Sequence, residues 1–282
     1  MATAGRFSRL IEDANRAGKF ICVGLDSELS RLPVAVMDNP LPQLMFNRQI
    51  IDATADIAAA YKPNSAFYES QGSAGFEALA ATIEYIHDVA PAAMVILDSK
   101  RGDIGSTNKG YREAMFGLLG ADAITIHPYL GFEAMQEFLS SPDLGAFVLC
   151  RTSNPGAGEF QDLRVATDDG PSRPLYEVVA EHVRDDWNAN GNCGLVIGAT
   201  YPGELEAIRS IVPAMPLLIP GIGAQGGDLA ATVAASGMHG GGPTLINSSR
   251  GIIFASANED FAIEAGRAAA LLHSEIAELR RG

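Results

Sequence analysis

Eight short apolar runs, nearly every one followed by a helical pattern, most constrain what this chain can fold into. The runs cover residues 20–26, 59–64, 93–97, 123–128, 146–152, 193–200, 216–220 and 243–249. Parallel strands that are covered by helices on both faces read as continuous apolar runs. No linker, composition break or residue-level repeat interrupts the alternation. We therefore predict a single domain over residues 1–282, an α/β fold of the (β/α)8 TIM-barrel class, because a doubly wound sheet usually has fewer strands.

The segments between the runs carry the helical periodicity that this fold requires. Helices are predicted at about residues 44–58, 76–89, 108–119, 132–139, 174–190, 202–211, 226–236 and 261–279. A short leading helix is also predicted, because Phe7, Leu10, Ile11 and Ala14 fall on one helical face. The polar segment 153–173 is predicted to be an extended loop, and long loops in compact domains are usually functional or disordered.

Composition narrows the class of partner. The formal net charge of −14 argues against nonspecific binding to nucleic acid and against an anionic membrane surface. The three cysteines lie in apolar runs without metal-ligand spacing, which is typical of reduced core residues in a cytosolic protein. The first 19 residues include Glu12 and Asp13 and do not form a signal peptide, and no apolar run approaches the ~20 residues of a membrane span. We expect a soluble, cytoplasmic protein with no nucleic-acid or membrane partner.

The third apolar run ends abruptly in charged residues. Side chains alternate across a strand, so Asp98 and Lys100 are predicted to point to one side, with Asp103 beyond a turn at Gly102. Such a cluster is costly to desolvate unless its members pair. A lone Asp-x-Lys could equally be a structural ion pair that caps a strand, but Asp-x-Lys-x-x-Asp followed by Ile-x-x-Thr is more specific.

Polar residues also gather at the ends of the first three runs. These residues are Asp26, Lys62, Asn64, Asp98 and Lys100. Active sites of barrels lie at the carboxyl ends of the strands, so these side chains are candidates for one site, although a single polar strand end can be ordinary solvation.

A second cluster suits an anion. Residues 221–227 are glycine-rich, follow the seventh run and open a predicted helix, so their backbone N–H groups can approach a phosphate. The formal match to G-x-G-x-x-G is weak, because no acidic residue follows at the dinucleotide-binding spacing. Arg250, just after the eighth run, favours a phosphate site, since barrels build such sites after strands seven and eight. The alternatives are a simple turn and a surface salt bridge.

The chain resembles the orotidine 5′-phosphate decarboxylase family, in particular its longer bacterial (type 2, mycobacterial-like) branch. The segments that carry the resemblance are residues 62–69, 98–107, 128–131, 152–155 and 220–227. The resemblance implies a lyase that converts orotidine 5′-phosphate to UMP and CO2 in pyrimidine biosynthesis. It also implies a homodimer with shared active sites and the use of no metal or organic cofactor.

The resemblance also implies roles for individual residues. Lys100 would donate a proton to C6, and Asp98 and Lys62 would form the charged network around the leaving carboxylate. By the same resemblance, the neighbouring subunit's site would receive Asp103, Ile104 and Thr107. Within the subunit's own site, Asp26 would contact the ribose, Asn64 the substrate and Ser153 the pyrimidine edge of the substrate. The phosphate would be bound by Gly223, Gln225 and Arg250. Segment 153–173 would close over the substrate as a lid.

Two rival functions remain open. Related sugar-phosphate decarboxylases and aldolase-like lyases share Asp-x-Lys-x-x-Asp but use a magnesium-stabilised enediolate. They tend to carry a metal-binding acid on the second strand, where this chain has Lys62. The other rival is a non-catalytic phosphate-binding barrel, which would have no need of the buried proton donor that the Asp98, Lys100 and Asp103 set provides.

Overall fold

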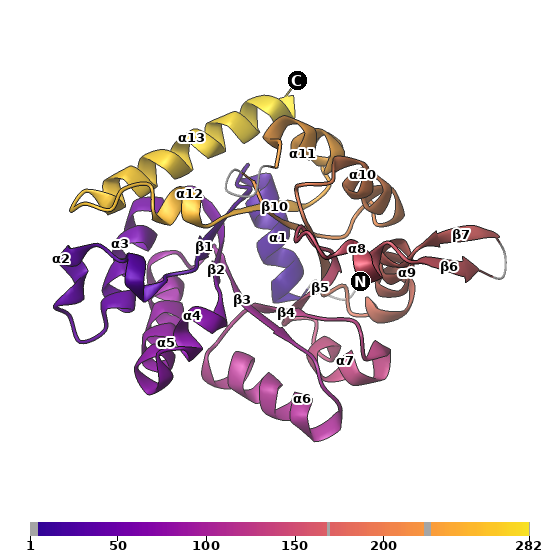
Figure 1. Ribbon diagram of the computed structural model, residues 1–282, viewed down its shortest axis with the longest axis horizontal. Coiled ribbons are helices and arrows are strands. Elements are labelled where there is room, and N and C mark those ends of the chain that lie inside the picture. Colours follow the sequence, from indigo (N-terminus) through magenta and orange to yellow (C-terminus); the bar gives the residue numbers. More distant parts are fainter. Residues whose placement is uncertain (1–4, 168–169, 223–226, 282) are drawn as a thin grey trace.

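Eight parallel strands close into a barrel in the computed structural model, which describes residues 5–167, 170–222 and 227–281 (Figure 1). Around the barrel the strands follow the order β1-β10-β9-β8-β5-β4-β3-β2. Their bounds are β1 Ile21–Leu25, β2 Ala58–Pro63, β3 Met94–Arg101, β4 Ala123–Ile126, β5 Gly145–Arg151, β8 Cys193–Ile197, β9 Leu217–Pro220 and β10 Thr244–Ser248. All eight apolar runs therefore contribute one barrel strand each, which confirms the predicted (β/α)8 class.

Helices surround the barrel on the outside (Figure 1). The α-helices are α1 Arg6–Arg16, α2 Val34–Met37, α3 Pro42–Thr54, α4 Ser65–Glu69, α5 Gly72–Val89, α6 Gly105–Arg112, α7 Gly131–Leu139, α9 Leu175–His182, α10 Pro202–Ile211, α11 Leu229–Ala235, α12 Arg250–Ile253 and α13 Phe261–Arg281. The predicted helices 108–119 and 174–190 each change to a π-helical turn, at Glu113–Leu118 and Val183–Trp187. No helix in the described ranges is long and apolar enough to cross a membrane.

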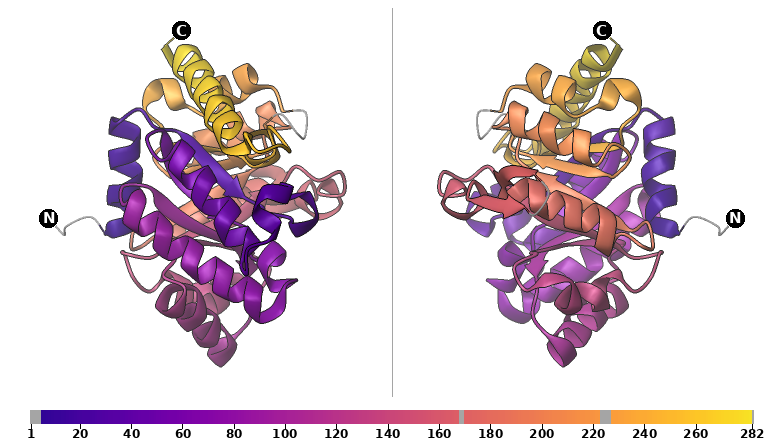
Figure 2. Two further views of the ribbon diagram at one scale, coloured as in Figure 1. Left: turned by 90° about the vertical axis from the view of Figure 1, so that its left-hand side faces the viewer. Right: turned by 90° about the vertical axis from the view of Figure 1, so that its right-hand side faces the viewer.

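The leading helix α1 closes one end of the barrel. Its buried Phe7 contacts Phe147 of β5 edge to face, with ring centroids 5.6 Å apart. The apolar face of α1 belongs to the same cluster as the inward-facing strand residues, whereas the outward-facing residues pack against the surrounding helices. Side views place α1 at one end of the barrel and the β6–β7 hairpin, described next, toward the other (Figure 2). Because α1 covers the opposite end of the barrel, a functional site can form at the carboxyl ends of the strands.

Segment 153–173 is not the extended loop that its polar composition predicts. It contains a short helix, α8 (Gly158–Gln161), and an antiparallel hairpin of β6 (Arg164–Thr167) and β7 (Gly170–Pro174). The hairpin forms a two-stranded sheet of its own and projects from the barrel (Figure 1). The prediction failed because a hairpin outside the core has no buried face, and without one its strands show no apolar pattern.

The strand that carries the charged motif is longer and less regular than predicted. β3 runs through Arg101, and its pairing with β4 shifts between Leu97 and Arg101. The chain leaves β3 just before Gly102, and the left-handed backbone of this region lies on either side of that residue, at Lys100, with φ of 46°, and at Gly105, with φ of 50°. Position 102 needs glycine for another reason: a Cβ there would lie 2.4 Å from the ring of His127.

Candidate active site

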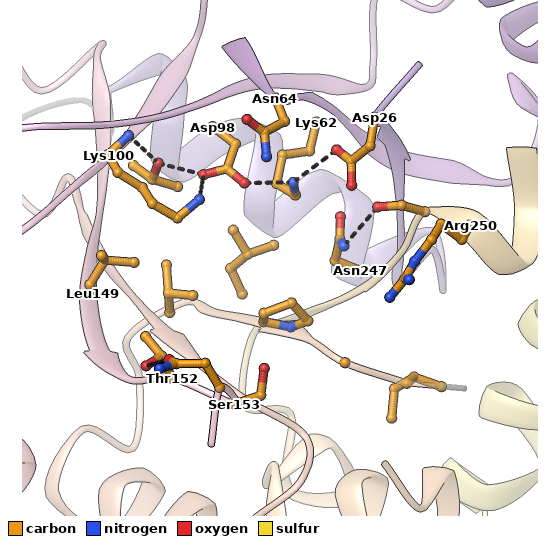
Figure 3. Close-up of a pocket in the computed structure, with 18 of the residues that line it drawn as sticks. Asp26, Lys62, Asn64, Asp98, Lys100, Leu149, Thr152, Ser153, Asn247 and Arg250 are labelled. Atoms are coloured by element: carbon orange, nitrogen blue, oxygen red, sulfur yellow. Dashed lines mark hydrogen bonds and ion pairs between the residues drawn. The ribbon is translucent and has the colours of Figure 1, made fainter. Parts of the chain in front are cut away.

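A cavity of about 510 Å³ opens at the carboxyl ends of the barrel strands (Figure 3). Its lining residues come from many elements: Asp26, Lys62, Asn64, Asp98, Lys100, Thr125, Leu149, Thr152, Ser153, Asn154, Gln161, Val196, Leu218, Pro220, Gly221, Ile222, Asn247, Ser249 and Arg250. The structure thus brings together the polar residues predicted at the ends of the first three strands, with Ser153 and Arg250 on the same cavity. One wall is charged, the facing wall carries neutral polar groups, and a third side contains Gly221 and Arg250.

Asp98 is the centre of the charged wall, where it accepts hydrogen bonds from three side chains (Figure 3). Its Oδ2 accepts from Lys62 Nζ at 2.9 Å, and its Oδ1 accepts from Lys100 Nζ at 2.6 Å. Thr125 Oγ1 also donates to Oδ1, at 2.8 Å. Asp98 therefore holds two ammonium groups on opposite sides of one carboxylate.

The charges of this cluster stabilise one another although most of them are buried. Burial alone would raise the pKa of Asp98, but the adjacent Lys62 and Lys100 ammonium groups outweigh it and hold that pKa well below its usual range. Burial alone would lower the pKa of Lys62, but the charges of Asp98 and Asp26 outweigh it and keep that pKa above its usual range. Both residues are therefore charged at neutral pH.

The two lysines of the cluster differ in how far their side chains are exposed to the cavity. Lys62 is only 4% exposed and lies between Asp98 and Asp26, whose Oδ1 is 3.8 Å from Lys62 Nζ. The Lys100 side chain is 50% exposed, so its ammonium group faces the cavity. A buried fixed cation and an accessible cation on one carboxylate suit charge stabilisation together with proton transfer. Asn64 borders the same wall and caps α4, where its Oδ1 accepts from the Ala66 N–H.

The facing wall is built where β5 leads into α8. Gln161 fixes this wall, because its Oε1 accepts from the Thr152 N–H at 2.8 Å and its Nε2 donates to Thr152 Oγ1 at 2.9 Å. Thr152 Oγ1 in turn donates to Asn154 Oδ1 at 2.7 Å. Behind them, the buried Arg151 pairs with Asp162 at 3.2 Å. Ser153 therefore lies on a segment that is held by hydrogen bonds at both ends.

The third side of the cavity fits the predicted anion site in part. Arg250 opens α12 after β10, and Gly221 follows the last residue of β9 with a positive φ of 107°, a conformation that favours glycine. Gly223 and Gln225, predicted to bind phosphate, lie outside the described residues.

Several cavity residues were missed by sequence reasoning, among them three with polar side chains, Thr125, Gln161 and Asn247. Thr125 and Asn247 lie within apolar strands and point inward, and Gln161 lies in the segment that was predicted to be a loop. A polar residue inside an otherwise apolar barrel strand is a usable signal, since burial of such a group requires a partner. Asn247 Oδ1 is buried and has no hydrogen-bond partner among the described residues, so it is available to a bound molecule.

Three predicted site residues lie away from this cavity. Asp103 accepts from the Ile104 N–H, and its own N–H donates to Asn108. Ile104 is 59% exposed and Thr107 is also exposed. None of the three belongs to the lining of this chain's own cavity. In the described part of the chain, no group of three or more His, Cys, Asp or Glu side chains is arranged to hold a metal ion.

Comparison with known proteins connects this geometry to one family. The model of the orotidine 5′-phosphate decarboxylase / HUMPS family matches residues 19–265. The orotidine 5′-phosphate decarboxylase of Cupriavidus metallidurans is 48% identical over 267 residues, which cover 95% of this chain and 96% of the relative. That of Thermomicrobium roseum is 47% identical over 274 residues, which cover 97% and 95%. The structure of Leishmania donovani OMP decarboxylase aligns with a TM-score of 0.82 and 38% identity, over 98% of this chain and 99% of the other.

Proposed function

The chain belongs to the orotidine 5′-phosphate decarboxylase / HUMPS family, and we propose that Lys62, Asp98 and Lys100 carry out its reaction. In that reaction the chain acts as a carboxy-lyase and converts orotidine 5′-phosphate to UMP and CO2. The observation that carries the proposal is the Lys62–Asp98–Lys100 arrangement on one wall of the cavity. A buried carboxylate that fixes two cations, one of them accessible, fits a reaction in which charge shifts onto a carbon atom.

The chemistry explains why an accessible ammonium group is needed. When the bond between C6 and the carboxylate breaks, its electron pair stays on C6, where no adjacent carbonyl group delocalises it. The Lys100 ammonium stabilises that carbanion electrostatically and then transfers a proton to C6, while CO2 leaves. The neutral amine takes a proton from solvent before the next turnover. Asp98 keeps Lys100 directed at the cavity and remains an anion itself.

The remaining side chains of the cavity bind the substrate. We assign Asp26, next to Lys62, to the ribose hydroxyls, and Ser153 on the facing wall to the pyrimidine edge. Asn64 completes the polar wall beside Asp98. Arg250 is assigned to the phosphate, together with Gly223 and Gln225. Binding energy from the remote phosphate can drive the closure of segment 153–173 over the site.

We further propose that the subunit is one domain and that two subunits form a homodimer with shared sites. Asp103 and Thr107 lie outside their own cavity, on a surface where Ile104, Tyr129 and Leu130 are exposed. Exposed apolar side chains of this size that adjoin polar residues are typical of an interface. In the dimer, Asp103, Ile104 and Thr107 would complete the partner's site. The buried, unpaired thiols of Cys22, Cys150 and Cys193 support a cytoplasmic location, where pyrimidine biosynthesis takes place.

The rival within the superfamily uses magnesium and an enediolate. In this chain the Lys62 ammonium lies between the carboxylates of Asp98 and Asp26, where a divalent cation would meet a positive charge. This placement favours the cofactor-independent reaction.

One experiment tests the proposal against both rivals. The purified protein is incubated with orotidine 5′-phosphate in excess chelator, and UMP is measured, with Lys100→Ala as the matched control. We expect chelator-insensitive turnover that falls by at least roughly 100-fold in the variant. Turnover only after magnesium is added would favour the enediolate lyase, and the absence of turnover would favour a binding barrel.

A further inference from the structure

We propose that Thr125 is a positioning residue for Lys100, because one hydroxyl group fixes both the backbone of that lysine and its carboxylate partner. The inference rests on the proposed role of Lys100 as proton donor. Thr125 is only 2% exposed and lies in β4, where it lines the cavity next to Asp98.

The irregular pairing of β3 with β4 explains why Thr125 has this position. Leu97 pairs with Ile124 and Arg101 pairs with Ile126, so a single residue of β4 faces the three residues 98–100 of β3. A bulge of this kind breaks the regular ladder and leaves backbone groups that need other partners. Bulges are over-represented next to active sites, where they redirect side chains.

The Thr125 hydroxyl replaces the interrupted ladder. Its Oγ1 accepts from the Lys100 N–H at 2.9 Å and donates to Asp98 Oδ1 at 2.8 Å. The same Asp98 oxygen accepts from Lys100 Nζ at 2.6 Å. The backbone and the ammonium group of Lys100 are therefore tied to one another through Thr125 and Asp98.

Lys100 needs this support more than its neighbours do. It is the non-glycine residue with a positive φ in the described ranges, and such a conformation persists only where the surroundings hold it. Its side chain is half exposed and is not confined by packing alone. Loss of the Thr125 hydroxyl would leave the Lys100 N–H without its partner and would free the bulge to relax.

A purely steric role for Thr125 is the alternative, and substitutions can separate the two. Thr125→Val keeps the shape but removes the hydroxyl, whereas Thr125→Ser keeps the hydroxyl and removes the methyl group. Thr54→Val is the matched control, because Thr54 is 1% exposed and its hydroxyl also has two partners, the Ile50 carbonyl in α3 and the Tyr61 hydroxyl, neither of which lines the cavity.

The test measures kcat and KM for orotidine 5′-phosphate together with thermal unfolding of each variant. We expect Thr125→Val to lower kcat on the order of 10- to 100-fold, because the Lys100 ammonium group is displaced from its position. KM should stay within about threefold of the wild type, because the groups that bind the substrate are unchanged. Thr125→Ser and Thr54→Val should keep kcat within about threefold of the wild type.

Two results would overturn the positioning role. One is a kcat for Thr125→Val that matches the wild type, and the other is a loss in Thr125→Ser at least as large as that in Thr125→Val, which would show that the site responds to the shape of the side chain and not to its hydroxyl group. Failure of the wild-type protein to produce UMP would instead contradict the proposed function, so the two failures are distinguishable.

Discussion

At the scale of single residues, the charged motif was visible in the sequence but its geometry was not. Alternation along a strand predicted that Asp98 and Lys100 share a side, and both do line the cavity. The direction of the Lys100 side chain depends on the shift in pairing register between β3 and β4. The pairing of two strands cannot be read from the local sequence of either strand. For the same reason Thr125, which lies 25 residues beyond Lys100, was missed.

The buried pair of Lys62 and Asp98 should have a measurable effect on stability. Asp98→Asn leaves Lys62 buried with Asp26 at 3.8 Å as its remaining carboxylate, so the free energy of unfolding should fall by about 3–5 kcal/mol at pH 7. Urea unfolding measures this loss. Asp13→Asn, which removes an exposed ion pair, is the control and should leave the stability nearly unchanged.

The pH dependence of that loss has a definite sign. The pKa of Asp98 is lower in the folded state than its unfolded value of about 3.9, so its stabilising contribution is full above roughly pH 4 and is lost as the pH falls through the folded pKa. The pKa of Lys62 is raised, so its contribution is full below roughly pH 10 and is lost as the pH rises through the folded pKa. The difference between wild type and Asp98→Asn should therefore shrink in acid. A difference that stays constant down to pH 3 would contradict this assignment.

At the scale of elements, the sequence predicted those that bury an apolar face and missed the one that does not. Barrel strands and amphipathic helices can be predicted from the sequence because their buried faces require apolar residues at regular positions. The apolar stripe of Phe7, Leu10, Ile11 and Ala14 correctly predicted α1 in this way. The β6–β7 hairpin pairs with itself, so nothing in its composition separated it from a loop. The position of α1 across the end of the barrel could not be predicted. Helical periodicity shows which face of a helix is buried, but it does not show which other element packs against that face.

Helix α1 should contribute stability without contributing to catalysis. Phe7 is fully buried against Phe147, at the end of the barrel opposite the cavity. Phe7→Ala should therefore lower the free energy of unfolding by about 3–5 kcal/mol, as measured in urea. Phe76→Ala, at a position that is 46% exposed, should cost clearly less. The kcat of folded Phe7→Ala protein should match the wild type, and a large fall in kcat would show that α1 also supports the site.

At the scale of the whole molecule, the closed barrel explains why residues from distant parts of the chain share one cavity. The carboxyl ends of all eight strands meet at one end, so β1, β3 and β10 deliver Asp26, Lys100 and Arg250 to the same space. The number of apolar runs predicted this closure. It gave no information about whether Asp103 serves a partner subunit, because contacts between subunits are not encoded in the order of strands within one chain.

Subunit mixing tests whether Asp103 serves the partner's site. Lys100→Ala inactivates the cavity of its own subunit, whereas Asp103→Ala should inactivate the cavity of its neighbour. A dimer with one subunit of each kind then combines both defects in one cavity and leaves the other cavity intact. Random exchange makes about half of the dimers hybrids, so about a quarter of all sites should be active.

The expected result is that two nearly inactive proteins, mixed under conditions of subunit exchange, regain up to about a quarter of the wild-type activity. Mixing Lys100→Ala with Thr125→Val is the control. Both residues lie in one chain's cavity, so a hybrid carries one defect in each site and should show no intact cavity. If the Asp103 mixture regains nothing although exchange is verified, then Asp103 acts within its own chain. Because Asp103 is only partly buried and lies outside its own cavity, the β3–α6 connection would then have to move toward that cavity.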